Sequence, residues 1–63
     1  MNRIKELREA KGLMQKELAQ LAHVSPPFLH DLEANHRGAK QETLERIADA
    51  LGVTVKDLKQ EAG

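Results

Sequence analysis

The chain has 63 residues and no cysteine, and its ten Lys and Arg residues balance ten Asp and Glu residues. This length predicts a single domain over residues 1–63, and the missing cysteine excludes a disulfide framework, a cysteine nucleophile and a cysteine zinc site. No apolar run reaches membrane-spanning length and no signal-peptide pattern opens the chain, so we expect a cytoplasmic protein. Ala, Leu, Glu, Lys and Gln dominate the composition, which predicts an all-α fold.

A first helix is predicted over residues 2–11. Ile4 and Leu7 recur on one face of this segment, with Ala10 beside them. Gly12 follows where a residue in the left-handed conformation would end the helix. The charged residues of the segment are expected to form a mostly solvated face.

The stretch 15–34 predicts two short helices joined by a tight turn. Ser25 is a favoured N-cap for the second helix, and Pro26 and Pro27 are tolerated in its first turn, where amide hydrogens have no partner within the helix. Both helices carry an apolar face, which consists of Leu18, Ala19, Ala22, Leu29 and Leu32. Helices this short bury little surface alone, so the flanking segments must support them.

The rest of the chain predicts a polar loop and two further helices. Residues 35–40 form the loop, with Gly38 for conformational freedom. An amphipathic helix follows and ends at Gly52, with inward positions at Leu44, Ile47, Ala48 and Leu51. Thr54 and Asp57 then supply the N-cap and the capping-box partner of a last short helix.

The spacing of seven residues in the stretch 15–34 resembles the helix-turn-helix of the Cro/cI-type (XRE-type) DNA-binding domains. These residues are Gln15, Ala19, Val24, Ser25, Leu29, Leu32 and Glu33. Residues 3–13, 42–53 and 54–58 resemble the first, fourth and fifth helices of that family. The resemblance implies a compact five-helix, lambda-repressor-like DNA-binding domain.

The resemblance also implies a structural ion pair between Arg8 and Glu33, which would tie the first helix to the end of the recognition helix. Two positions depart from the family pattern. Met14 stands at a cap position where the family usually has Ser or Thr, so that helix loses about 1 kcal/mol of capping. His23 stands in the turn where the family prefers glycine, and we expect a positive φ there.

Carried over residue by residue, the family's DNA contacts imply two kinds of site. Phosphate contacts fall at the starts of the second and fourth helices and in the loop before the fourth, and base-facing positions fall on the recognition helix. The candidate DNA-binding residues are Gln15, Lys16, Ser25, Pro26, Pro27, His30, Asp31, His36, Arg37, Lys40 and Gln41. Between residues 35 and 41 the chain has cations and no acid, whereas Glu42, Glu45, Asp49, Asp57 and Glu61 gather towards the C-terminus.

Direct reading of bases by this helix is expected to be sparse. Pro26 and Pro27 have no donor to offer a base edge, and Asp31 could accept from cytosine but would repel phosphate. Three interpretations remain open: the chain relies on loop contacts and DNA shape, it binds weakly, or the scaffold serves another use.

The leading functional hypothesis is a sequence-specific DNA-binding regulator, of repressor type, that binds operator half-sites through the major groove as a weak homodimer. Dimerisation is expected at the C-terminal end, where Val53, Val55 and Leu58 are more apolar than a capping helix requires. The alternative is a protein-interaction module that gates a partner, supported by the neutral charge and an apolar Leu21. No enzyme activity, cofactor or metal is expected, because Ser25 looks like a cap and the three histidines form no H-x-x-x-H pair.

Overall fold

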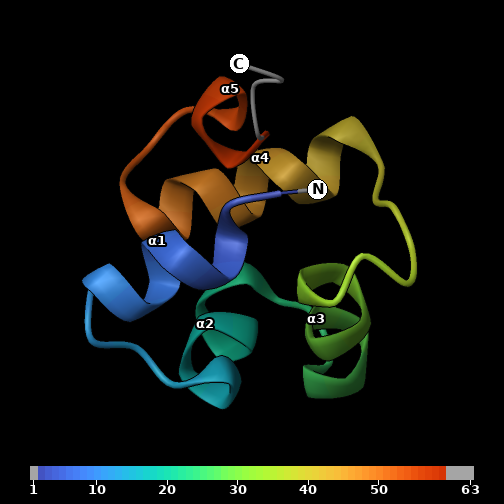
Figure 1. Cartoon of the computed structure of the whole chain (residues 1–63), viewed down its shortest axis with the longest axis horizontal. Coiled ribbons are helices and arrows are strands. Elements are labelled where there is room, and N and C mark those ends of the chain that lie inside the picture. Colours follow the sequence, from blue (N-terminus) through green and yellow to red (C-terminus); the bar gives the residue numbers. More distant parts are fainter. Residues whose placement is uncertain (1, 60–63) are drawn as a thin grey trace.

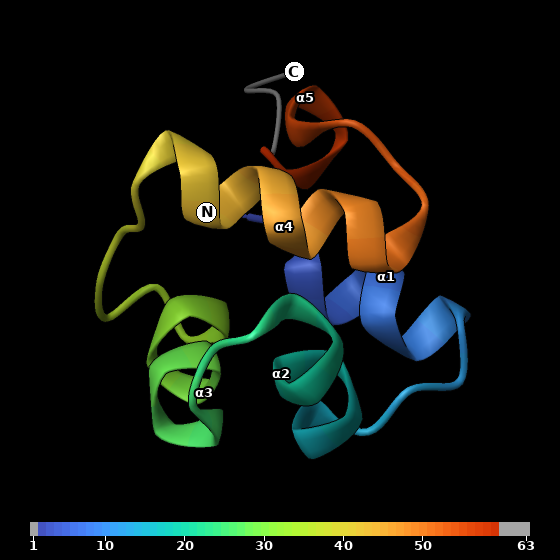
Figure 2. The ribbon, with the colours of Figure 1, turned by 180° about the vertical axis from the view of Figure 1, so that it is seen from behind.

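Five helices make up the part of the chain that the structure, a computed structural model, describes, which is residues 2–59 (Figure 1). They are α1 (Ile4–Ala10), α2 (Gln15–Ala22), α3 (Pro26–Glu33), α4 (Gln41–Leu51) and α5 (Val55–Leu58). α4 packs against both α2 and α5, and α2 also packs against α3. In both ribbon views α4 lies between α5 at one end and the α2–α3 pair at the other (Figure 2). The all-α, five-helix fold expected from the sequence is confirmed.

The core forms where the apolar faces of all five helices meet. Its largest fully buried side chains are Ile4, Leu18, Leu29, Ile47, Leu51 and Leu58. Each helix contributes at least one of them, so no helix buries its apolar face alone. None of the helices within residues 2–59 has the length and apolar character needed to cross a membrane. Glu61, one of the acids that the sequence groups towards the C-terminus, lies outside the described residues.

Helix α1 is shorter than the predicted segment 2–11 because its first residues are used differently. Asn2 pairs with Lys59 in an isolated antiparallel bridge. The amide of Arg3 donates to the carbonyl oxygen of Leu58 over 2.8 Å. The side-chain oxygen of Asn2 accepts from the amide of Ile4 at 3.0 Å, which satisfies one free donor at the start of the helix. The segment before α1 therefore joins the two ends of the chain.

Helices α1 to α4 all end in a left-handed turn. The residues with positive φ are Gly12 at 74°, His23 at 58°, Asn35 at 62° and Gly52 at 71°. After each of them the next amide donates back to a carbonyl five residues earlier, as His36 N does to Asp31 O over 2.8 Å. This is the Schellman arrangement, which satisfies carbonyls that the helix leaves free. The positive φ expected at His23 is confirmed, whereas the sequence placed Asn35 only in a polar loop.

The N-caps of α2 and α5 differ in the way the sequence indicates. At α5, the Thr54 hydroxyl accepts from the Asp57 amide at 3.2 Å, and the Asp57 carboxylate accepts from the Thr54 amide at 3.0 Å. These hydrogen bonds, the one from the backbone first, lower the pKa of Asp57 below its ordinary value of 3.8. At α2, Glu17 accepts from the Met14 amide at 2.8 Å, but the Met14 side chain makes no cap hydrogen bond. Helix α2 therefore has one half of a capping box.

Candidate nucleic-acid interface

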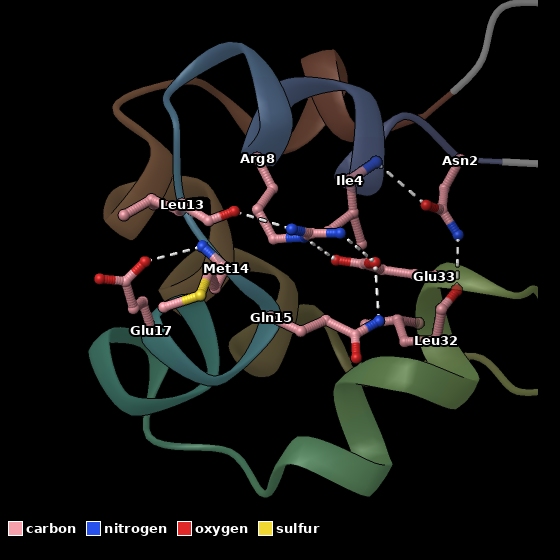
Figure 3. Close-up of polar contacts among 9 residues, drawn as sticks. All are labelled: Asn2, Ile4, Arg8, Leu13, Met14, Gln15, Glu17, Leu32 and Glu33. Carbon is pink, nitrogen blue, oxygen red and sulfur yellow. Dashed lines mark hydrogen bonds and ion pairs between the residues drawn. The ribbon is translucent and has the colours of Figure 1, made fainter.

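The C-terminal end of α3 is fixed by a buried polar network centred on Glu33 (Figure 3). Arg8 of α1 donates to both carboxylate oxygens of Glu33, from Nε over 2.7 Å and from Nη2 over 3.2 Å. Gln15 of α2 donates to the same carboxylate over 3.0 Å. The remaining Arg8 Nη1 donates to the carbonyl of Leu13 over 2.7 Å. The ion pair expected between Arg8 and Glu33 is thus present, and it includes a third helix.

This network is shielded from water. The side chain of Arg8 is 10% exposed and that of Glu33 is 3% exposed. The hydrogen bond to Glu33 raises the pKa of Arg8 above its ordinary value, against the opposing effect of burial. A buried pair of charges is expensive to break from one side, because the charge left behind has no solvent. The network therefore sets the position of α3 against α1 and α2.

Asn2 adds a second attachment at the same end of α3. Its side-chain amide donates to the carbonyl of Leu32 over 2.8 Å and to the side-chain oxygen of Asn35 over 3.0 Å. Figure 3 shows Asn2 between the start of α1 and the end of α3. One side chain thus holds a free carbonyl at the end of α3 and a free amide at the start of α1.

The N-terminal end of α3 is exposed. Ser25, Pro26, Pro27 and His30 all face solvent. The Ser25 hydroxyl accepts from the Phe28 amide at 3.2 Å, so it serves as the predicted N-cap. Proline offers no donor to a base edge, and His30 can donate or accept. This end of α3 is therefore exposed but poor in groups that discriminate between bases.

Asp31 and His36 lie next to one another on the exposed side of α3 and its C-terminal turn. The Asp31 carboxylate and the His36 Nδ1 are 3.9 Å apart, and both side chains are about half or more exposed. The pair is ionic only when His36 is protonated. Asp31 thus adds a negative charge to the surface that would face DNA, offset in part when His36 is charged.

The loop from α3 to α4 brings the cations predicted for phosphate contact to the surface. Arg37 and Lys40 are exposed, and Lys40 is the N-cap residue of α4. Gln41, the first residue of α4, is also exposed and donates to Glu45 at a long 3.5 Å. Amide hydrogens at a helix start have no partner within the helix and favour anions. Cations and a helix N-terminus therefore share this edge.

An open hollow of about 500 Å³ joins this loop to the start of α3. It is lined by Phe28, Arg37, Gly38, Ala39, Lys40, Glu42 and Thr43. The guanidinium carbon of Arg37 lies over the Phe28 ring, 4.1 Å from the ring centroid. The structure thus brings Arg37 and Lys40 close to the first turn of α3, which the sequence spacing alone does not show.

The two candidates on α2 lie in different surroundings. Lys16 is exposed. Gln15 is half-buried, and one hydrogen of its amide group is used in the bond to Glu33. The same nitrogen carries a second hydrogen that could reach a phosphate. Gln15 therefore connects the buried network to the surface at the start of α2.

The residues expected at a dimer interface do not share one environment. Val53 and Val55 are half-buried, whereas Leu58 is 1% exposed and belongs to the core. Leu58 is therefore part of the monomer's own packing, because α5 uses it to cover α4 and α1. The two apolar residues most exposed elsewhere are Met14 and Leu21, each 55% exposed.

Sequence reasoning missed several of these contacts. The bonds from Asn2 to α3, from Gln15 to Glu33 and from Arg46 Nε to the Ala22 carbonyl (3.0 Å) all join residues far apart in the chain. No periodic pattern marks such contacts. The nearest available signal was composition, because Asn, Gln and Arg side chains next to helix ends often bind free backbone groups.

Comparison with known proteins identifies the fold and the family. The model of a helix-turn-helix family matches residues 4–58 of this chain. Among curated proteins, the chain is 43% identical over 56 residues to the HTH-type transcriptional regulator DdrOP3 of Deinococcus deserti, covering 89% of this chain and 43% of that protein. It is 40% identical over 53 residues to the immunity repressor protein of Bacillus phage phi105, covering 84% of this chain and 37% of that protein. The chain thus spans less than half the length of these two relatives.

Solved structures give the same result. The restriction-modification controller protein C.AhdI from Aeromonas hydrophila aligns with a TM-score of 0.84 and 31% identity, covering 87% of this chain and 83% of that chain. The N-terminal DNA-binding domain of the biofilm regulator SinR from Bacillus subtilis aligns with a TM-score of 0.81 and 34% identity, covering 95% and 88%. The clp gene regulator ClgR from Corynebacterium glutamicum aligns with a TM-score of 0.82 and 35% identity, covering 86% and 57%. With the family model matched over nearly all of its length, this chain belongs to the XRE-type helix-turn-helix family.

Proposed function

We propose that this chain is the sequence-specific DNA-binding module of a repressor-type transcription regulator. The observation that carries the proposal is the exposure of one end of α3 while its other end is fixed by Asn2, Arg8 and Gln15. Such a helix can enter the major groove as a rigid element. The relatives that bear names are regulators, and one is a phage immunity repressor, which supports the repressor type.

In the proposed complex the two kinds of contact are separated. Arg37, Lys40 and the start of α4 would hold the phosphate backbone on one side of α3, and Gln15 and Lys16 at the start of α2 would hold it on the other. His30 and Asp31 would face base edges, and Pro26 and Pro27 would touch sugar or a thymine methyl. With few donors on α3, most of the affinity would come from phosphate contacts and DNA shape.

The alternative, a protein-interaction module, has less support. Leu21 is exposed as that hypothesis requires, but single exposed apolar residues are ordinary on soluble domains. Phe28, the other suggested anchor, is half-buried and covered by Arg37. The relatives and structural neighbours named above are regulators or controller proteins. We therefore retain DNA binding as the proposed function.

Selection of bound sequences from a random duplex pool tests the proposal. We expect a recurring motif to be enriched, and the enriched duplex to bind more tightly than a scrambled duplex of equal length. Affinity for both should fall steeply as salt rises, because bound cations displace counterions from DNA. A pool without enrichment, together with binding that does not respond to salt, would contradict DNA binding and favour the protein-interaction alternative.

We further propose a weak homodimer formed near α5, with Val53 and Val55 as its apolar contacts. α5 lies at the opposite end of the molecule from α3, so pairing there would leave both recognition helices free (Figure 1). The apolar surface available is small, so DNA would complete the dimer. Two-fold pairing would match half-sites about one helical turn apart.

Val55→Lys should weaken self-association and binding to a two-half-site duplex while leaving the helical circular dichroism largely intact. Leu21→Lys is the matched control for self-association, because Leu21 is an exposed apolar residue on a different helix. Sedimentation equilibrium of both variants decides the point. Equal self-association of Val55→Lys and the unmodified chain would place any dimer surface elsewhere.

A further inference from the structure

The contact between Arg37 and Phe28 links the α3–α4 loop to the first turn of α3. The guanidinium carbon lies 4.1 Å from the ring centroid, well within the range of about 6 Å at which a cation is attracted to an aromatic face. Phe28 is the single aromatic residue of the chain. It is half-buried and packs against the core from α3, while Arg37 is exposed in the loop. A rigid helix thus supports a cation carried by an irregular segment.

Arg37 has few other restraints within residues 2–59. It takes part in none of the ion pairs found there, and its one side-chain hydrogen bond runs from Nε to the neighbouring Gly38 carbonyl at 3.3 Å. That bond joins adjacent residues and cannot fix the loop against α3. An unsupported arginine loses much rotamer freedom when it binds a ligand. The Phe28 ring is therefore the contact that orients this guanidinium relative to the recognition helix.

The stack leaves the donors of Arg37 available. An aromatic ring interacts with the face of a guanidinium, whereas the N–H groups point outward in its plane. Lys40 lines the same open hollow, so two cations meet at this edge. A phosphate group approaching the edge could bind the guanidinium without displacing it from the ring.

We propose that Phe28 is a positioning residue for DNA binding, which holds the Arg37 guanidinium in place for a phosphate contact without touching DNA itself. This inference rests on the proposed function, since it concerns how the proposed phosphate contact is prepared. The stack acts by pre-organisation: the cation is already oriented in the free protein, so less freedom is lost on binding.

A double-mutant cycle on duplex binding tests the proposal. Phe28→Leu removes the aromatic face and keeps an apolar side chain of similar size. We expect it to weaken binding to any duplex about two- to fivefold, the change that a cation–π contact at an exposed site would account for. Phe28→Tyr keeps the ring and should bind within about 1.5-fold of the unmodified chain. In an Arg37→Ala background, Phe28→Leu should have almost no further effect, because the cation it orients is absent.

Lys40→Ala provides the matched background, because Lys40 lines the same hollow and is not stacked on the ring. There Phe28→Leu should keep its full two- to fivefold effect. Loss of folding would lower binding equally in both backgrounds, so the contrast between them separates positioning from stability. Circular dichroism at the titration temperature gives the folded fraction of each variant.

Three results would overturn the inference while leaving DNA binding in place. These are equal binding by Phe28→Leu and the unmodified chain, tighter binding by Phe28→Leu, and the same effect of Phe28→Leu in both backgrounds. Tighter binding would mean that Arg37 must leave the ring to reach DNA. Failure of the unmodified chain to bind any duplex would instead remove the proposed function and this inference together.

Discussion

The two ends of α3 differ in what holds them and in what they offer. At the C-terminal end, Leu32 and Glu33 accept hydrogen bonds from Asn2, Arg8 and Gln15, so three other segments fix the helix. At the N-terminal end, the Ser25 hydroxyl is used as a cap and the two prolines have no donor. The fixed end supplies position and the free end supplies little recognition chemistry. The comparison teaches that binding strength must come largely from the residues beside α3, at its phosphate-facing edges.

Breaking the fixed end should produce the largest effect. Arg8→Leu leaves the Glu33 carboxylate buried with Gln15 as its remaining side-chain donor, and we expect a loss of about 3 kcal/mol in the free energy of unfolding. That is a large share of the roughly 3–9 kcal/mol expected for a domain of this size. Urea unfolding followed by circular dichroism measures the change.

Arg3→Leu is the matched control for this prediction. Arg3 also pairs with a glutamate, Glu6, but its side chain is 43% exposed and that of Glu6 is 63% exposed. Exposed pairs contribute little, so the change should stay within about 0.5 kcal/mol. Similar small effects of Arg8→Leu and Arg3→Leu would show that the buried network does not fix α3.

Completing the cap of α2 should strengthen the fixed end by a smaller amount. Met14 has the extended backbone of an N-cap, and Glu17 already accepts from its amide. Met14→Ser would add the missing acceptor and is expected to raise the free energy of unfolding by about 0.5–1 kcal/mol. Denaturant titration beside the unmodified chain measures this gain. No gain would mean that the burial of the Met14 side chain matters more than the cap.

His23→Gly is expected to have the smallest effect, a gain of about 0.5 kcal/mol. His23 has φ of 58°, a conformation that glycine adopts without strain, although glycine also increases the freedom of the unfolded chain. Asn35→Gly, at φ of 62°, is a useful comparison because Asn35 also accepts from Asn2 through its side chain. We expect Asn35→Gly to be the less stable of the two variants. The opposite order would show that the Asn2 contact contributes little.

Local patterns in the sequence were sufficient to predict the five helices and most of their caps. Apolar periodicity placed Leu18, Leu29 and Ile47 in the core, where they are fully buried. The α5 capping box followed from Thr54 and Asp57 alone, because both partners lie within one turn. The Arg8–Glu33 pair was implied by the family resemblance, since nothing in the local sequence connects α1 to α3.

Contacts between distant segments could not be predicted in this way. Asn2 reaches Leu32 across 30 positions, and nothing near either residue announces the bond. The Phe28–Arg37 stack depends on the path of an irregular loop, for which sequence periodicity carries no information. Leu58 showed the reverse problem: an apolar residue near the chain end suggested an interface, but the packing of α5 places it in the core.

The account's central claim is that phosphate contacts beside α3 supply most of the DNA affinity, and Arg37→Ala tests it most directly. Binding of this variant, of the unmodified chain and of Arg3→Ala as control should be titrated over a salt series, on a selected duplex and on its scrambled counterpart. We predict that Arg37→Ala weakens binding similarly on both duplexes and lowers the slope of log affinity against log salt by about one, while Arg3→Ala changes neither. An unchanged slope with an altered preference between the duplexes would contradict the claim, because Arg37 would then read bases.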